Sequence, residues 1–260
     1  MTFAIDLEGQ RALVTGAGQS IGRAIALALA EAGATVAVND IVPDHAAAVV
    51  DEIVARGGQA DALPFDVTDY EQVAAALKGY GDVSLLVNNA GNAGVDGLVW
   101  PRDFVETTPD EWGRYFAVNL FGTMNCTHVV LPSMISAGWG RIVTLVSDAG
   151  RNGDAKVAPY AAAKAGAAGF CRSIAREAGR HGITVNCVSL GSIETPAKIE
   201  ARAAREPSPE RERKMLEPYV IRRHGQPEDV AGLVTYLASP LASWITGQTY
   251  AVNGGYTFSL

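Results

Sequence analysis

The sequence has few cysteines, no excess of basic residues and no long apolar run. Its three cysteines, Cys126, Cys171 and Cys187, lie far apart and form no CxxC pair, which excludes a cysteine-based zinc or redox motif. The 21 Lys and Arg residues are outnumbered by 28 Asp and Glu residues, so no general positive field attracts nucleic acid. We therefore expect reduced, buried thiols, no nucleic-acid partner and no metal site.

Segments that direct a chain to or through a membrane are also missing from the pattern. The N-terminal residues 1–8 have no basic n-region, and nowhere do about 18 uncharged apolar residues follow one another. We expect no signal peptide, no membrane association and a cytoplasmic location. With 260 residues, of which 48% are hydrophobic, the chain is long enough for a sizeable core, and we expect one domain over 1–260.

Short β-rich runs alternate with longer helical stretches from end to end. The expected strands are 11–15, 35–38, 60–65, 84–87, 141–146, 184–189 and 249–252. The expected helices include 21–31, 45–56, 70–78, 109–137 and 160–181. This alternation predicts an α/β fold with a doubly wound, mostly parallel, seven-stranded Rossmann-type sheet and helices on both faces.

The segment 197–219 is dense in charge and is interrupted by three prolines. A long polar insertion of this kind in a compact α/β unit is either a mobile lid or a solvated helical excursion, and the sequence favours neither strongly. We interpret the region around 196–219 as a substrate lid within the single domain.

Glycines cluster between the first predicted strand and the first predicted helix, in TGAGQSIG at 15–22. The free N–H groups and the positive dipole end of a helix lie there, and small residues allow a pyrophosphate to approach. A tight turn without a ligand, or a site for another nucleotide-like ligand, is the alternative. We predict that the cofactor contacts in this loop come from Gly16, Gly18, Gln19, Ser20, Ile21 and Gly22.

Asp40 ends the second predicted strand and bears on the choice of cofactor. A carboxylate at this point hydrogen-bonds the two ribose hydroxyls of NAD and repels the 2′-phosphate of NADP. The next residue is Ile41, where a basic residue would suit NADP. We predict NAD, with NADP less favoured; the alternative is that Asp40 only caps the helix that begins just beyond Pro43.

Tyr160 and Lys164 are four residues apart at the start of a predicted helix, so they share one face. Ser147 ends an earlier strand at the carboxyl edge of the sheet, where ligands of open α/β sheets bind. A Lys164 ammonium about 4 Å from the phenol would contribute about 4 kcal/mol and lower the pKa of Tyr160 by roughly three. A Tyr/Lys pair at this spacing is common on exposed helices; joined to the glycine loop and Ser147, it indicates acid/base catalysis.

These motifs resemble the classical short-chain dehydrogenase/reductase family over nearly the whole chain. Further matching positions are Asp66 in FDV, NNAG at 88–91, Asn119, Arg223, QPEDV at 226–230, ITG at 245–247 and VNGG at 252–255. The residues of these motifs are most similar to those of 3-oxoacyl-thioester reductases and of dehydrogenases that act on cyclic hydroxyacyl-CoA. The resemblance implies hydride transfer between nicotinamide C4 and a secondary carbinol or ketone carbon.

The resemblance also implies roles for individual residues. Tyr160 would be the acid/base, Ser147 would hold the substrate oxygen, and Lys164 would lower the tyrosine pKa and bind the nicotinamide ribose. Asn119 would hold a water in a proton relay. The further cofactor contacts implied by the family are Asp66, Val67, Asn89, Ala90, Gly91, Gly191, Ile193 and Thr195.

Two positions depart from the family pattern. Ser20 stands where the family usually has glycine, and a positive φ there would indicate backbone strain. Leu190 stands where the family usually has proline, which leaves the loop after the sixth strand less constrained. Neither departure touches the catalytic groups.

The expected walls of the substrate pocket are 92–104, 148–158 and the segment from Ile193 through the insertion. The first is rich in apolar side chains (Val95, Leu98, Val99, Trp100 and Phe104), which favours an apolar or ring-bearing substrate unless they only pack the core. We expect a 3-hydroxyacyl/3-oxoacyl thioester of CoA or a carrier protein. A sugar or polyol, a small cyclic ketone or steroid, and a non-catalytic dinucleotide sensor are the alternatives; the Tyr/Lys pair disfavours a methyltransferase.

Two helical features bear on partners. Arg172, Arg176 and Arg180 follow one helix face, which either meets an acidic carrier protein or is simply solvated. The long helices 109–137 and 160–181 are expected, by resemblance, to pair across a dimer within a homotetramer.

Overall fold

The computed structural model describes residues 4–92, 102–204 and 208–258. Its seven strands form one sheet in the order β3-β2-β1-β4-β5-β6-β7, and all neighbouring pairs are parallel. The strands are β1 (Arg11–Val14), β2 (Thr35–Val38), β3 (Gln59–Ala62), β4 (Leu85–Asn88), β5 (Gly140–Ser147), β6 (Ile183–Leu190) and β7 (Thr249–Val252). The doubly wound, parallel Rossmann-type sheet predicted from the sequence is confirmed.

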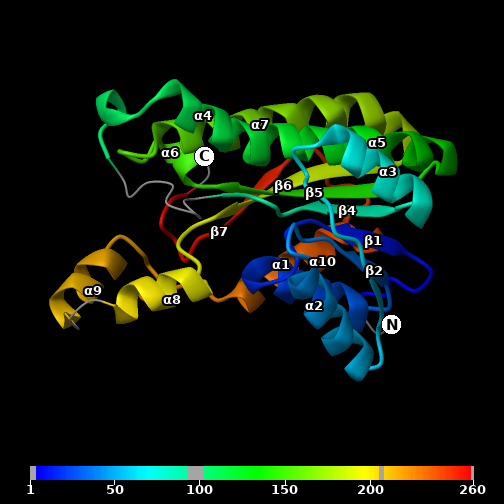
Figure 1. Cartoon of the computed structure of the whole chain (residues 1–260), viewed down its shortest axis with the longest axis horizontal. Helices are drawn as coiled ribbons and strands as arrows, with labels where there is room; N and C mark the ends of the chain where they lie inside the picture. The colour runs from blue at the N-terminus through cyan, green and yellow to red at the C-terminus, as the bar shows by residue number, and fades with distance from the viewer. Residues whose placement is uncertain (1–3, 93–101, 205–207, 259–260) are drawn as a thin grey trace.

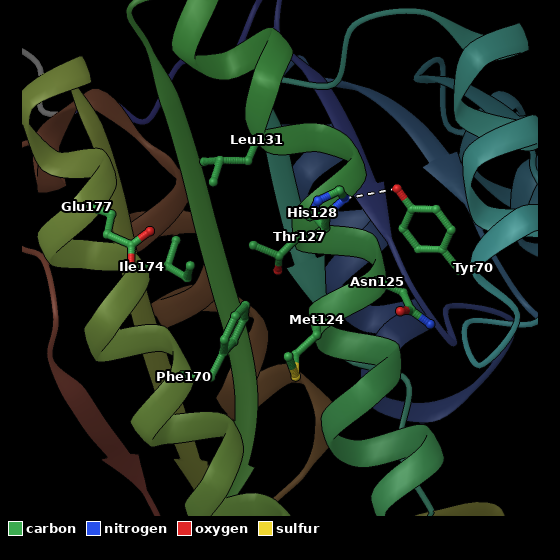
Figure 2. A pocket seen from close by; sticks show the side chains of 9 residues that line it. All are labelled: Tyr70, Met124, Asn125, Thr127, His128, Leu131, Phe170, Ile174 and Glu177. Atoms are coloured by element: carbon green, nitrogen blue, oxygen red, sulfur yellow. Dashed lines mark hydrogen bonds between the residues drawn. The ribbon is translucent and has the colours of Figure 1, made fainter.

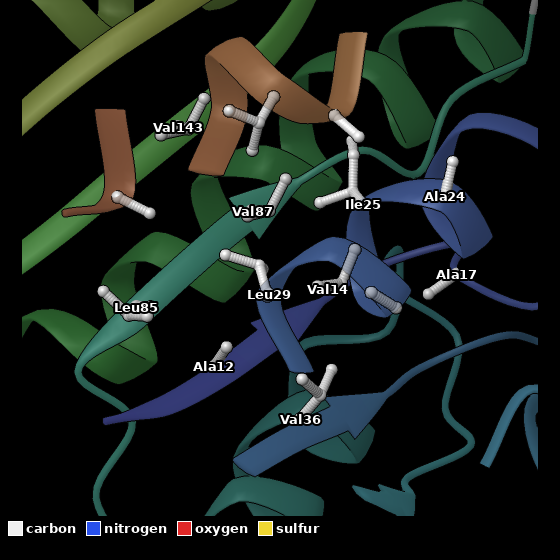
Figure 3. Packing of buried hydrophobic residues seen from close by; sticks show 14 of the residues in the cluster. Ala12, Val14, Ala17, Ala24, Ile25, Leu29, Val36, Leu85, Val87 and Val143 are labelled. Carbon is white, nitrogen blue, oxygen red and sulfur yellow. The ribbon is translucent and has the colours of Figure 1, made fainter. Parts of the chain in front are cut away.

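Helices cover both faces of this sheet (Figure 1). One layer contains α1 (Ser20–Glu31), α2 (Pro43–Ala55) and α10 (Pro227–Ala238), and the other contains α3 (Tyr70–Tyr80), α4 (Pro109–Phe116), α5 (Gly122–Ala137) and α7 (Ala158–Ala178). Successive strand residues point to opposite faces, so consecutive apolar residues in the central strands supply side chains to both cores. In β1, Val14 packs in the core with α1 and α10 (Figure 3), whereas its neighbour Leu13 packs in the opposite core.

The long helix expected over 109–137 is interrupted. A π-helical segment, Ala117–Phe121, separates α4 from α5. Within it, the amide nitrogen of the Asn119 side chain donates to the carbonyl oxygen of Tyr115, at 2.9 Å. A side chain that occupies a backbone acceptor disturbs the regular ladder of the helix, which is a common setting for π-helical turns. The interruption places Asn119 in the interior, where it is 1% exposed.

The charged insertion is helical in its described part. It forms α8 (Pro196–Ala203) and α9 (Pro209–Leu216), which project away from the two main layers (Figure 1). Ser208 caps α9, because its hydroxyl accepts a hydrogen bond from the Arg211 N–H at 3.3 Å.

All three cysteines are free and buried, as expected. Burial raises the pKa of Cys126 to about 12, which keeps that thiol neutral. None of the helices formed by residues 4–92, 102–204 and 208–258 has the length and apolar character needed to cross a bilayer.

Candidate active site

The site lies at the carboxyl ends of four adjacent strands, β1, β4, β5 and β6. Because the strands are parallel, the segments that follow them meet at one edge of the sheet. The chain runs outward in opposite directions from β1 and from β4, and this reversal opens a crevice between the two halves. The glycine loop, Asn89–Gly91, Ser147 and Gly191 all follow these strands.

Tyr160 lies in the first turn of α7, directly after Pro159, which favours the start of a helix. The Ser147 hydroxyl lies beside the Tyr160 phenol, and it accepts a hydrogen bond from the Ala149 N–H at 3.2 Å. The ring of Tyr115 stands edge-on to Tyr160, with 6.2 Å between the ring centres. Burial raises the pKa of Tyr160, and the interaction with the Ser147 hydroxyl opposes that rise.

Lys164 is buried one turn further along α7. Its ammonium donates to the carbonyl oxygen of Leu145 at 2.9 Å and lies 6.0 Å from the centre of the Tyr160 ring. Burial lowers the pKa of Lys164 to about 8. From the sequence we expected Lys164 to lower the pKa of Tyr160; in this structure the pKa of Tyr160 is raised instead, because desolvation of the phenol is the largest effect.

Asn119 and Lys164 both approach Gly91 closely. The Asn119 amide nitrogen donates to the Asn92 side-chain oxygen at 2.6 Å, while its own side-chain oxygen is buried without a partner among the described residues. A Cβ at Gly91 would lie 2.8 Å from that oxygen and 3.2 Å from the Lys164 nitrogen, so only glycine allows both side chains to lie this close to the backbone. The unpartnered Asn119 oxygen is an acceptor that suits a water molecule or another small polar group.

The glycine loop is bound to the end of β4. The Thr15 hydroxyl accepts hydrogen bonds from the N–H groups of Asn89 and Ala90, both at 3.0 Å. In return, the Asn89 side chain donates to the carbonyl oxygens of Thr15 and Gly16 at 2.8 and 2.9 Å. Gly16 has a φ of +59°, a conformation that favours glycine.

The loop ends at the start of α1, where the N-terminus of the helix is suited to bind an anion. The N-cap residue Gln19 makes no side-chain capping bond, and the first turn has no acidic residue. The first N–H groups of a helix lack intrahelical partners, so they are available to a pyrophosphate here. Ser20 has a φ of +50°, so the strain foreseen at this position is present.

Asp40 follows β2 and is 7% exposed. One carboxylate oxygen accepts from the Gly18 N–H at 3.1 Å and the other from the Val42 N–H at 3.0 Å. The N-cap of α2 is Val42, so Asp40 does not cap that helix. A Cβ at Gly18 would lie 2.7 Å from the Asp40 carboxylate, which explains why glycine is needed there. The carboxylate beside a helix N-terminus fits the adenosine end of a dinucleotide.

Comparisons with known proteins agree with this geometry. Residues 16–257 match the family described as Enoyl-(Acyl carrier protein) reductase. The chain is 40% identical over 253 residues to the 7alpha-hydroxysteroid dehydrogenase of Escherichia coli K12, covering 96% of this chain and 94% of that protein. It is also 40% identical to a 3-oxoacyl-[acyl-carrier-protein] reductase of Synechocystis, over 96% of this chain and 97% of that protein.

A solved structure of 7alpha-hydroxysteroid dehydrogenase with NADH and 7-oxo glycochenodeoxycholic acid superimposes with a TM-score of 0.86 at 39% identity, over 96% of this chain and 95% of the other. The chain belongs to the short-chain dehydrogenase/reductase family. It is therefore an oxidoreductase that acts on CH–OH groups with a nicotinamide dinucleotide.

The other expected cofactor contacts of this dehydrogenase have the following local surroundings. The Asp66 carboxylate accepts from the N–H and hydroxyl of Thr68, at 2.8 and 2.9 Å, and Val67 is buried. Gly191 faces Asn253, because a Cβ at Gly191 would lie 3.0 Å from the Asn253 Cα. Beyond it, Ile193 is buried, and the Thr195 hydroxyl accepts from the Lys198 N–H at 3.3 Å.

A functional position that we did not predict from the sequence is Asn39, which joins the segments that follow β1, β2 and β3 of this dehydrogenase. Its side-chain oxygen accepts from the Gly16 N–H at 3.3 Å, and its amide donates to the carbonyl oxygens of Leu63 and Phe65 at 3.1 and 3.0 Å. The one signal in the sequence was a polar residue at the end of a buried strand, next to Asp40. The expected pocket residues Val95, Leu98, Val99 and Trp100 lie outside the described residues.

A cavity of about 380 Å³ lies between α5 and α7 and contains none of the four predicted catalytic residues (Figure 2). Its lining is largely apolar, with Met124, Leu131, Phe170 and Ile174 facing one another. At one end, Tyr70 and His128 share a hydrogen bond of 2.9 Å. The cavity lies along α5 and α7, whereas the cofactor crevice lies at the carboxyl ends of the strands.

Proposed function

We propose that this short-chain dehydrogenase is NAD-dependent and interconverts a secondary alcohol and a ketone with Tyr160 as acid/base. The supporting observation is that Tyr160 lies beside the Ser147 hydroxyl, one helical turn from the buried Lys164 and at the same sheet edge as the glycine loop. The dinucleotide, held by the loop and the first turn of α1, supplies a hydride donor or acceptor at nicotinamide C4.

The residues divide the remaining work. Ser147 donates a hydrogen bond to the substrate oxygen, and Tyr160 gives a proton to that oxygen or takes it away. Lys164 provides a positive charge beside the phenol and a donor for the nicotinamide ribose. The buried, unpartnered oxygen of Asn119 accepts a hydrogen bond from a water that continues the proton path from Lys164. These are the roles implied by the family, applied to residues that lie together here.

NAD is favoured over NADP by the charges around Asp40. The Asp40 carboxylate lies at the end of β2, and the following Ile41 is 67% exposed and offers no charge to a phosphate. The ring of His45 lies 4.0 Å from Asp40, and the guanidinium of Arg23, on α1, is bound to Glu52 by two hydrogen bonds of 2.7 and 2.5 Å. A 2′-phosphate would therefore meet a negative charge first.

For the substrate we favour a 3-hydroxyacyl or 3-oxoacyl thioester of CoA or a carrier protein, with α8 and α9 forming a lid over its chain. The name of the Synechocystis relative supports this class. A cyclic or steroid alcohol is the second candidate, favoured by the edge-on Tyr115 ring beside Tyr160 and by the steroid relative. Both candidates place an apolar group near the reacting carbon.

A turnover panel tests this choice. Purified enzyme is given 3-oxoacyl-CoA, cyclic ketones, 7-oxo bile acids and ketosugars, each with NADH and with NADPH. The proposal expects kcat/KM with NADH to be largest for the 3-oxoacyl thioester. A preference for bile acids or cyclic ketones would select the second candidate, and turnover of none of them would contradict the proposed reaction.

We also propose a homotetramer, one domain over 1–260 and a cytoplasmic location. The apolar cavity along α5 and α7 supports the pairing of these helices with a second copy. Arg172, Arg176 and Arg180 are exposed and free to face an acidic carrier protein. The three free thiols fit a reducing compartment.

A further inference from the structure

Asp148, which directly follows Ser147, is a buried carboxylate that the proposed chemistry does not use. It is 1% exposed. One of its oxygens accepts from the Ser189 hydroxyl at 2.5 Å and from the Arg151 guanidinium at 3.3 Å. The other accepts from the Asn253 amide at 2.5 Å and the Thr257 hydroxyl at 3.3 Å. Its burial and its many donors keep this carboxylate from contacting substrate.

These donors come from separate parts of the chain. Ser189 belongs to β6, Arg151 to the short helix α6 (Ala149–Asn152), and Asn253 and Thr257 to the segment after β7. A buried carboxylate is costly unless several hydrogen bonds compensate its lost hydration. The four donors therefore hold Asp148 in one place and connect the end of β5 to the end of β6 and to the C-terminal segment.

The backbone around Asp148 sets the direction of the Ser147 hydroxyl. The Asp148 N–H donates to the carbonyl oxygen of Leu190 at 3.0 Å, and its φ and ψ of −60° and −25° turn the chain into α6. This turn brings the Ala149 N–H to 3.2 Å from the Ser147 hydroxyl oxygen. The bond from Ala149 occupies one acceptor site of the Ser147 hydroxyl and holds its oxygen in place beside Tyr160, where it opposes the rise in the pKa of the phenol.

We propose that Asp148 is a positioning residue, whose carboxylate holds the turn that aims the Ser147 hydroxyl at Tyr160 and the substrate oxygen. The inference rests on the proposed role of Ser147. Asp148 touches neither substrate nor cofactor; it acts through Ser147. Loss of its negative charge leaves the Ser189 and Asn253 donors poorly matched, because an asparagine amide would present N–H groups to one of them.

A double-mutant cycle tests the inference. The variants are Asp148→Asn, Ser147→Ala and the double variant, and the readout is kcat at saturating substrate and cofactor. Asp148→Asn is expected to lower kcat by about 10- to 100-fold. In the Ser147→Ala background the same change is expected to alter kcat by less than about threefold, because the group through which it acts is already gone.

The outcomes separate this inference from the proposed function. A normal kcat for Ser147→Ala overturns the role of Ser147 and the inference with it. A low kcat for Ser147→Ala, with an undiminished loss from Asp148→Asn in that background, overturns the inference alone. An Asp148→Asn kcat within about twofold of wild type also overturns it.

Asp69→Asn is the control for loss of an aspartate that accepts hydrogen bonds. Asp69 accepts from the N–H groups of Glu71 and Gln72 at 3.0 and 3.1 Å at the start of α3, and it belongs to none of the expected cofactor contacts or pocket walls. The kcat of Asp69→Asn is expected to stay near wild type. If Asp148→Asn does not fold, Thr257→Val removes one donor and leaves the carboxylate paired. That variant is expected to lower kcat several-fold, again only when Ser147 is present; an equal loss without Ser147 contradicts the inference.

Discussion

The Lys164 ammonium lies 6.0 Å from the centre of the Tyr160 ring, on the same face of α7. Burial acts on the two groups in opposite directions: it lowers the pKa of Lys164 and raises that of Tyr160. Each shift favours the neutral form of its group. Both side chains therefore lie in an environment that disfavours their ionised forms. As a result, Lys164 loses its proton at a pH close to neutral.

That titration predicts how stability changes with pH. The pKa of Lys164 is about 8 in the folded protein, below its usual value of 10.5. Between these two pH values the unfolded chain keeps a proton that the folded protein has released, so stability rises with pH. From pH 7.5 to 9.5 the unfolding free energy of the wild type is expected to gain about 2 kcal/mol relative to Lys164→Met.

Denaturant unfolding of both proteins at several pH values measures this difference. Lys164→Met removes the titrating group and keeps much of the side-chain volume, so changes from other titrating groups cancel in the comparison. A difference that stays constant from pH 7.5 to 9.5 would show that Lys164 does not titrate in this range.

Tyr160→Phe removes the hydroxyl and keeps the ring that packs against Tyr115. We expect kcat to fall by about 10²- to 10⁴-fold, because the proton donor and acceptor is lost. NADH affinity, measured by fluorescence titration, is expected to stay within about twofold, since the ring still supports the site. Near-normal turnover would contradict Tyr160 as the acid/base.

Ser20→Gly is expected to stabilise the protein. At a φ of +50° a side chain costs about 1 kcal/mol that glycine avoids. The matching rise in Tm is about 2 to 4 °C by calorimetry. Ser20→Ala is the control, because it removes the same hydroxyl and keeps the Cβ; equal Tm values for the two variants would show that the backbone is not strained.

Asp40→Ala tests the preference for NAD. We expect NADH binding to weaken by about 10- to 100-fold, as hydrogen bonds to a charged acceptor are lost. NADPH binding, measured by the same titration, is expected not to weaken. Asp40 also accepts hydrogen bonds from Gly18 and Val42, so its loss could disturb the whole loop. In that case the binding of NADH and of NADPH would weaken equally, which the comparison of the two titrations detects.

Ile174→Arg places a charge in the apolar cavity between α5 and α7. If these helices pair across a dimer, the buried charge should break the tetramer into smaller species, as seen by light scattering. Val54→Arg, on the opposite helix layer, is the control and should keep the wild-type mass. An unchanged mass for Ile174→Arg would show that the subunit interface does not include this cavity.

Local features of the chain were sufficient for much of the fold and for the candidate catalytic group. The short apolar runs that alternate with helical stretches between Arg11 and Val252 predicted the parallel sheet. The glycines around Gly16 predicted the cofactor loop at its crevice. The four-residue spacing of Tyr160 and Lys164 is a helical spacing, so it placed both on one face without knowledge of the rest. These properties depend on neighbours in sequence, which is why they can be predicted from it.

Other properties depend on residues brought together from distant parts of the chain. The π-helical interruption at Asn119, the positive φ at Ser20 and the direction of the pKa shift of Tyr160 each follow from packing and burial around those positions. Asp148 is one acidic residue among 28 in the sequence; its donors Ser189, Asn253 and Thr257 lie 41 to 109 residues away. Tertiary structure alone decided these features, because long-range contacts set burial and hydrogen-bond partners.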